Sequence, residues 1–262
     1  MSALTPAPAG PGEADPGNSC RSGAVSTAAT GTGNEPPLPI TAVIPTLNAA
    51  VGLARTLTAL QGTVECVLVV DGGSTDGSPA IAAQAGARVV SAPRGRGQQL
   101  AAGAALAATP WVLFLHADTI PGPGWRDAAA RFLADPANAG RAAHFRFTLD
   151  DASTEARCLE RWVARRCRWL GLPYGDQGLL IRRDFYARLG GFRPIPIMED
   201  VDLVRRIGRR RMAALDAPFV TSAARWRREG WGRRSRRNLA CLALWFLGVS
   251  PERIARLYGR GS

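Results

Sequence analysis

Short apolar runs alternate with amphipathic, helix-like stretches along the middle of the chain. Residues 40–44 form a β-prone run that ends at Pro45, and residues 65–70 are almost continuously apolar, which is typical of a parallel strand covered on both faces. Further strands are predicted at residues 88–90, 111–115, 142–149 and 179–182, and helices at 48–60, 79–85, 98–108, 125–134, 154–170 and 199–207. This alternation predicts an α/β fold with a mostly parallel central sheet flanked by helices.

The last part of the chain predicts a helical C-terminus. Residues 239–247 are apolar, Gly248 is expected to end this helix, and Ser250-Pro251-Glu252 is a typical start of another. The apolar run is much shorter than the ~20 residues that a membrane-spanning helix needs. With arginines just upstream, it could lie on an anionic membrane surface. The alternative is a helix packed on the core.

Composition divides the chain into two parts. Residues 1–38 are rich in Ala, Pro, Gly, Ser and Thr and hold almost no large apolar side chains, so we expect a disordered tail. One folded domain is expected over residues 39–262. The tail lacks the basic start and apolar core of a signal peptide. Five cysteines without metal-ligand spacing are typical of free thiols, so a cytoplasmic protein is expected, with association at the cytoplasmic face of the membrane as an open alternative.

The charge is strongly positive and comes from arginine alone. The formal net charge is +12, and all 33 basic residues are arginines. The absence of lysine excludes a phosphate-loop NTPase and a Schiff-base enzyme, because both chemistries need a lysine. Many of the arginines lie between residues 205 and 237, and such a surface attracts phosphate, whether on nucleic acid, a nucleotide sugar or an anionic lipid.

Carboxylates follow two of the predicted strands. Asp71 follows the second strand and precedes Gly72, where a carboxylate can accept hydrogen bonds from a base or ribose; the alternative is an ordinary Asp-Gly turn. Asp118 follows another strand, and His116 lies two residues before it, on the same side of an extended segment. Carboxylate oxygens suit a hard divalent cation that bridges a diphosphate. The alternative is a buried His with a helix-capping Asp.

A third acidic group begins a predicted helix. Glu199 and Asp200 could supply the general base that takes a proton from an attacking hydroxyl, or they could simply favour the positive end of a helix dipole. Asp202 should face elsewhere and is interpreted as structural. Candidates to bind diphosphate or sugar are three arginines and a polar loop: Arg94, Arg96, Arg225, Asp176 and Gln177.

Together these motifs resemble family 2 glycosyltransferases of the GT-A fold. The resemblance rests on residues 42–48, the Asp71 and Asp118 motifs and residues 199–202, and it covers roughly residues 39–258. Residues 114–118, 173–178 and 221–223 resemble a narrower bacterial group that gene context often links to arsenosugar biosynthesis.

The resemblance implies roles for individual residues. Pro45, Thr46 and Asn48 would line the nucleotide pocket, and Asp71 would contact the base. Asp118 would hold Mg²⁺ or Mn²⁺ with the diphosphate of a UDP- or GDP-linked sugar, and Asp200 or Glu199 would be the base of an inverting transfer to an acceptor hydroxyl of unknown identity. Four positions depart from the family pattern: Gly72 and His116 each stand where relatives carry Asp, Ala101 stands where many relatives have Asn, and Ala224 stands where the narrower group tends to have Arg.

Two other functions remain open at this point. A nucleotidyltransferase shares this type of sheet, but Pro45-Thr46-Leu47-Asn48 replaces the Gly-rich basic loop that such an enzyme usually carries after its first strand. A non-enzymatic protein that binds nucleic acid or lipid would explain the charge but not the carboxylates at the strand ends. We therefore predict a metal-assisted glycosyltransferase with no specific nucleic-acid partner.

Overall fold

A computed structural model of the protein describes residues 35–259. Its strands are β1 (Leu38–Thr46), β2 (Val64–Asp71), β3 (Arg88–Ser91), β4 (Trp111–Phe114), β5 (Thr119–Pro121), β6 (Ala142–Leu149), β7 (Leu179–Arg182) and β8 (Met212–Thr221). Its α-helices are α1 (Ala50–Leu60), α2 (Ser78–Gln84), α3 (Arg96–Ala105), α4 (Trp125–Ala134), α5 (Thr154–Leu170), α6 (Arg183–Arg188), α7 (Glu199–Ile207), α8 (Ala224–Glu229), α9 (Trp231–Phe246) and α10 (Pro251–Gly259). Three short 3-10 helices are η1 (Pro136–Gly140), η2 (Gly175–Gln177) and η3 (Arg209–Arg211).

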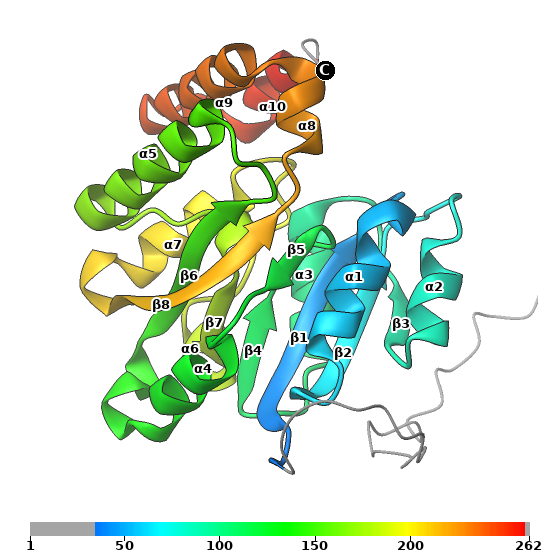
Figure 1. The fold of residues 1–262 in the computed structure, drawn as a ribbon. Coiled ribbons are helices and arrows are strands. Elements are labelled where there is room, and N and C mark those ends of the chain that lie inside the picture. The colour runs from blue at the N-terminus through cyan, green and yellow to red at the C-terminus, as the bar shows by residue number, and fades with distance from the viewer. Residues whose placement is uncertain (1–34, 260–262) are drawn as a thin grey trace, which may run out of the picture. The chain divides into compact units, whose positions relative to one another are not determined.

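All these strands belong to one eight-stranded sheet in the order β3-β2-β1-β4-β7-β6-β8-β5. Strands β3, β2, β1 and β4 are mutually parallel, β7 runs against both of its neighbours, and β6 and β8 are parallel to each other. The predicted α/β fold with a mostly parallel sheet is therefore confirmed (Figure 1). The carboxyl ends of β1, β2 and β4 meet at one edge, because parallel neighbours end on the same side.

Two apolar clusters cover the two faces of the sheet. Along β1, Ile40, Ala42 and Ile44 pack with α1 and α4, whereas Val43 packs on the other face with α3, α6 and α7. This switch between faces at every residue follows from the alternation of side chains along a strand. A strand buried on both faces has an almost continuous run of apolar residues, which is why β1 and β2 could be predicted from the sequence.

Several elements were not predicted. Strands β5 and β8 and helix α8 are absent from the predicted set, and α9 begins at Trp231, eight residues before the predicted apolar run at 239. Strand β8 contains Asp216 and Pro218, and its pairing with β6 shifts register between Phe145 and Arg146, so it shows no simple alternation. The first half of α9 is rich in arginine and carries no apolar stripe.

Two smaller differences concern the start of the folded part and the cysteines. The predicted disordered tail falls mostly outside the described residues; within them, Leu38 already pairs with Val64 in the sheet. Cys158, Cys167 and Cys241 are free thiols, as predicted, but Cys66 is disulfide-bonded, so the prediction is wrong at that position. No helix in residues 35–259 has the length and apolar character needed to cross a membrane.

Candidate active site

The turn after β1 and the turn after β2 are tied together at the carboxyl edge of the sheet. Asn48, at the start of the helix predicted over 48–60, lies before α1 and has a left-handed backbone (φ 50°), and its Oδ1 accepts a hydrogen bond of 2.8 Å from the Thr75 amide. The amide of Ala50, in the first turn of α1, donates to Asp76 Oδ2 at 2.9 Å. The helix is thus capped from a distant loop, which local sequence signals could not indicate.

Asp71 holds the turn in which it lies. It is almost completely buried, and its Oδ2 accepts hydrogen bonds from the amides of Gly73 (2.9 Å) and Ser74 (3.0 Å). The Gly72 amide donates to the Thr46 carbonyl, which joins this turn to the end of β1. Asp71 and Gly72 do not line the neighbouring cleft, so the geometry places them behind it as supports.

Gln99, which the sequence did not indicate, links the same two strand ends. Its Nε2 donates to the Thr46 carbonyl at 2.8 Å and to the Val70 carbonyl at 2.7 Å. A Cβ on Gly72 would lie 3.0 Å from that Nε2, so glycine leaves room for the amide. A glutamine in a helix has no sequence signal of its own; only the approach of α3 to the sheet gives it this position.

A cleft of about 640 Å³ opens in front of these turns. It collects eight of the residues that the sequence proposed for nucleotide, diphosphate or metal: Pro45, Thr46, Asn48, Arg94, Arg96, His116, Asp118 and Arg225. A smaller adjoining cavity of about 170 Å³ shares Arg96, His116, Asp118 and Arg225 and adds Asp176 and Asp200. Residues from six separate segments therefore converge on one continuous site.

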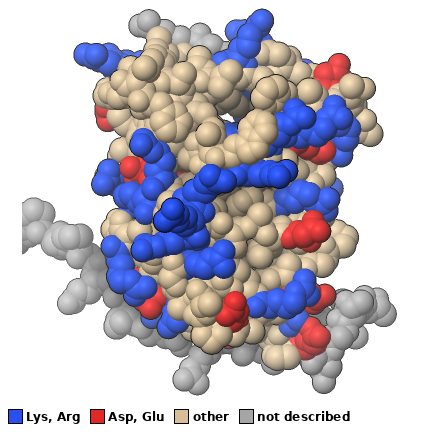
Figure 2. Space-filling model, turned by 90° about the vertical axis from the view of Figure 1, so that its left-hand side faces the viewer, with Lys and Arg blue, Asp and Glu red and all other residues tan. Residues whose placement is uncertain are grey.

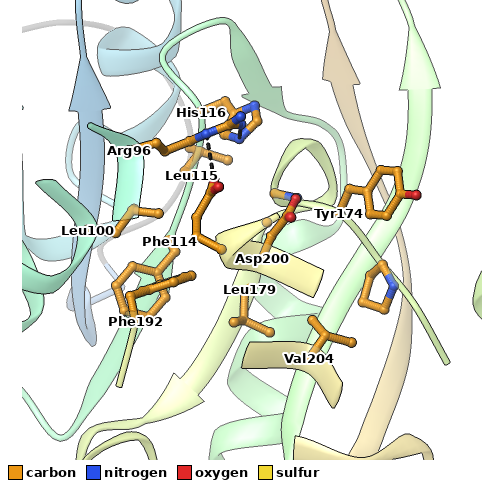
Figure 3. A pocket seen from close by; sticks show the side chains of 14 residues that line it. Arg96, Leu100, Phe114, Leu115, His116, Tyr174, Leu179, Phe192, Asp200 and Val204 are labelled. Atoms are coloured by element: carbon orange, nitrogen blue, oxygen red, sulfur yellow. Dashed lines mark hydrogen bonds and ion pairs between the residues drawn. The ribbon is translucent and has the colours of Figure 1, made fainter. Parts of the chain in front are cut away.

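Arg96 lies at the centre of this site. Its Nε is 2.6 Å from Glu199 Oε1, and its NH1 is 2.9 Å from His116 Nε2 (Figure 3). The negative charge of Glu199 raises the pKa of Arg96. Burial, together with the charges of Arg96 and Arg225, holds the pKa of His116 well below its usual value, so the imidazole is neutral at pH 7. His116 Nε2 is therefore the acceptor for Arg96.

The two carboxylates at the start of α7 lie in different surroundings. Glu199 is only 1% exposed and is paired with Arg96. Asp200 is partly exposed, lines the cavity, and accepts a hydrogen bond of 3.0 Å on Oδ2 from the Gly175 amide. The residue before them, Met198, has a left-handed backbone (φ 65°), a strained conformation for a non-glycine residue that is common at functional sites. Asp202 faces elsewhere and pairs with Arg193 and Arg206, as predicted.

The loop that carries Asp176 closes tightly over His116. A Cβ on Gly175 would lie 2.5 Å from His116 Nε2, so only glycine fits there. Asp176 Oδ1 is buried without a hydrogen-bond partner among residues 35–259. Burial, reinforced by the charges of Asp200 and Asp118, raises the pKa of Asp176 to about 6. Gln177 points away from the cleft, because its side chain bonds His144, Phe145 and Cys167.

The C-terminal helices complete the site. Arg234 and Asn238 from α9 and Tyr258 from α10 line the same small cavity as Asp200. Cys241 and Leu242 on the inner side of α9 are buried, the latter in a cluster with Val201 and Val204 of α7. For residues 239–247 the sequence left open a helix on a membrane surface or a helix packed on the core. The inner side of α9 is packed on the core.

Asp118, which lines both cavities, and Asp176, which lines the smaller one, provide hard oxygen donors. The unpartnered oxygen of Asp176 and the partly exposed carboxylate of Asp118, 3.8 Å from Arg225 NH2, are groups that a divalent cation accepts. No cluster of three or more ligating side chains occurs within the described residues, so a cation there would need further oxygens from a ligand. The donor set fits Mg²⁺ or Mn²⁺ held jointly with a diphosphate.

Comparison with known proteins defines the family. The model of glycosyl transferase family 2 matches residues 41–188, which is more than half of the chain. The chain therefore belongs to glycosyl transferase family 2, and the predicted enzyme class is confirmed. This membership decides against the two alternatives, a nucleotidyltransferase and a non-enzymatic basic protein. A search of curated proteins finds no match.

Solved structures with the same fold include two of glucosyl-3-phosphoglycerate synthase from Mycobacterium tuberculosis. The complex with Mn²⁺, UDP and glucosyl-3-phosphoglycerate has 22% identity and a TM-score of 0.51, over 68% of this chain and 70% of that chain. The complex with Mg²⁺ and UDP has 23% identity and a TM-score of 0.52, over 68% and 69%. A further match is described as a mycobacterial protein, with 22% identity, a TM-score of 0.50 and coverage of 70% and 66%. At this identity the likeness shows the fold.

Proposed function

We propose that this glycosyltransferase moves a sugar from a nucleoside diphosphate to an acceptor hydroxyl, with inversion at the sugar carbon. The observation that carries the proposal is the convergence of Arg94, Arg96, Arg225 and Asp118 with Asp200 on one continuous cleft. Guanidinium groups bind phosphate oxygens with two parallel hydrogen bonds, so the large cavity suits the nucleotide and diphosphate. The small cavity beneath α9 and α10 then suits the acceptor.

Asp200 is the better of the two candidate bases. Glu199 is buried and neutralises Arg96, and it would leave the guanidinium of Arg96 without its partner if it took up a proton. Asp200 faces the small cavity, and the Gly175 amide holds one of its oxygens in place. We assign the proton transfer from the acceptor hydroxyl to Asp200 and a positioning role to Glu199.

The cation requirement follows from the charge that the leaving diphosphate carries. Asp118, with Asp176 beside it, would hold Mg²⁺ or Mn²⁺, and the cation would supply positive charge to the diphosphate oxygens. His116 Nε2 is already engaged by Arg96, so we propose that His116 orients Arg96 and is not a cation ligand. The structural neighbours with Mn²⁺ or Mg²⁺ and UDP support a UDP-linked donor and this cation class.

One experiment tests the assignment of the base. Asp200→Asn keeps the shape of the side chain and its acceptor oxygen for the Gly175 amide, but it cannot take a proton. We expect the rate of sugar transfer to fall by roughly 10²–10⁴-fold, the usual contribution of a general base, while the Kd for UDP measured calorimetrically stays unchanged. A variant that loses UDP binding would show a role in folding or donor binding instead.

We also propose that the outer side of α9 contacts an anionic membrane surface. Leu239 and Phe246 of α9 and Leu247 directly after it are exposed, and Arg233 and Arg236 are exposed nearer the start of the same helix. Co-sedimentation with phosphatidylserine vesicles, compared with phosphatidylcholine vesicles, tests this; binding that survives Leu239→Ser/Phe246→Ser/Leu247→Ser would contradict it. The cytoplasmic location and the resemblance to the arsenosugar-linked group stay predictions.

A further inference from the structure

A second cavity, larger than the catalytic cleft, lies beneath α5. Its volume is about 900 Å³, and its walls come from α5, β6, β8 and the segment of Arg209. None of its lining residues lines the catalytic cavities. The pairing of β6 with β8 shifts register at this place, between Phe145 and Arg146, and a bulge of this kind commonly bends a strand beside a binding site. We call this cavity the α5 groove.

The interior of the α5 groove is mainly apolar. Phe147, Val163, Leu215 and Pro218 contribute to its walls. The polar groups at its inner end already bond one another, because the Gln177 amide lies 3.2 Å from both His144 Nδ1 and the Phe145 carbonyl. Burial lowers the pKa of His144, so the ring is neutral and carries no charge into the groove. The interior therefore offers apolar surface to a ligand and few polar contacts.

The rim of the groove is positively charged. Arg161 and Arg168 are seven residues apart on α5 and face the same side, and Arg209 packs against Gly171 at the end of that helix. These three side chains have no carboxylate partner among residues 35–259. The other two arginines of the rim do have one, since Arg146 pairs with Asp216 and Arg157 pairs with Glu160. Figure 2 views the side on which α5 and β8 lie in Figure 1 and shows basic side chains gathered across this face.

The outer side of α5 carries two exposed tryptophans. Trp162 is 62% exposed and Trp169 is 63% exposed, and each follows one of the rim arginines in sequence. Tryptophan next to arginine is favoured where an apolar phase meets water, because the indole ring is apolar and its N–H is polar. Helix α5 thus combines the chemistry of a lipid interface with one wall of an apolar groove.

We propose that the α5 groove binds a single-chain anionic lipid. The apolar chain would occupy the interior, and the phosphate or carboxylate group would lie at the rim on Arg161, Arg168 and Arg209. The volume lies within the range of about 300–1,000 Å³ that small-molecule sites usually have, and a mainly apolar lining with a few fixed charges is typical of such sites. The proposal does not depend on the assignment of the catalytic residues.

Calorimetric titration with dodecyl phosphate below its micelle concentration tests the proposal on the full chain. We expect saturable binding near one molecule per protein. Dodecyl maltoside has the same chain without charge, and inorganic phosphate has the charge without a chain; each should bind at least about tenfold more weakly, since both parts contribute. Equal affinity for dodecyl maltoside would overturn the role of the arginines, and equal affinity for inorganic phosphate would overturn the role of the apolar interior.

Variants locate the binding site. Arg161→Gln/Arg168→Gln/Arg209→Gln should weaken dodecyl phosphate binding at least about tenfold, whereas Arg131→Gln/Arg253→Gln/Arg256→Gln removes the same charge from α4 and α10 and should leave it within about twofold. Ala164→Trp, which fills the groove, should abolish binding while UDP affinity shows that the fold is intact. Equal losses in both triple variants, or displacement of dodecyl phosphate by UDP, would place the lipid outside the groove and overturn the proposal.

Discussion

The cleft proposed for catalysis and the α5 groove lie in one compact unit of the chain but are built in opposite ways. In the cleft, the two arginines nearest the small cavity are paired with acids: Arg96 with Glu199, and Arg225 with Asp118. In the groove, an apolar interior is bordered by arginines, three of which have no carboxylate partner within residues 35–259. Paired charges in a partly buried site are fixed in position and suit chemistry, whereas unpaired charges at an exposed rim suit capture of an anion.

The largest expected effect concerns the central ion pair of the cleft. Arg96→Gln leaves Glu199 as an unpaired buried charge, and we expect a loss of about 3–5 kcal/mol in the free energy of unfolding by urea. Arg94→Gln is the matched control, because Arg94 lines the same cleft without a carboxylate partner among the described residues, and it should cost less than about 0.5 kcal/mol. Adding Glu199→Gln to Arg96→Gln should restore part of the loss. Similar costs for the two single variants would show that the pair contributes no specific stability.

A second prediction tests the close approach of the Asp176 loop to His116. Gly175→Ala introduces a Cβ 2.5 Å from His116 Nε2 and should destabilise the protein by about 1–3 kcal/mol while also displacing the amide that holds Asp200. Gly232→Ala is a control of opposite sign, because that position in α9 has open space around it and alanine favours a helix by about 0.5–1 kcal/mol. Thermal unfolding and transfer rates measure both. A harmless Gly175→Ala would mean that the loop is free to move.

A third prediction concerns pH. The pKa of Asp176 is about 6 in the folded protein against 3.8 for an unperturbed Asp, so between pH 4 and pH 6 the folded state keeps a proton that the unfolded state has released. Stability without ligands should therefore fall as pH rises through that window. Asp176→Asn should remove this fall and be more stable than the parent by about 1–3 kcal/mol at pH 7. Urea titrations at pH 4, 5, 6 and 7 measure it, and parallel curves for the two proteins would contradict the assignment.

The smallest expected effect compares the two regions directly. Arg161→Gln/Arg168→Gln/Arg209→Gln should leave UDP affinity within about twofold, because the groove shares no lining residue with the cleft. The same titration at 50 mM and 200 mM salt controls for a general effect of net charge, which would weaken at higher salt. A large loss of UDP affinity at both salt concentrations would show that the two regions are coupled.

Much of the first half of the fold could be predicted from the sequence. Strands such as β1 and β2 are buried on both faces, so their apolar runs are local and visible, and the candidate carboxylates Asp71 and Asp118 lie next to the ends of β2 and β4 in the sequence. The resemblance to the glycosyltransferase family was visible for the same reason. The elements of the second half could not all be predicted from local apolar patterns. Strand β8 is bulged and α9 starts with arginines, so neither shows a regular repeat of apolar residues.

The sequence by itself determined the chemical inventory of this enzyme: arginines without lysine, carboxylates at the strand ends, and the Glu199-Asp200 pair. Only the tertiary structure decided which of these arginines and carboxylates face the cleft and which are engaged by a partner. In the folded chain Glu199 pairs with Arg96, whereas Asp200 faces the cavity. The side chain of Asp71 accepts hydrogen bonds from the turn in which it lies, and α9 and α10 cover the site. The physical reason is that residue type and spacing specify local conformation and charge, whereas burial and the choice of partner depend on contacts between segments far apart in the chain.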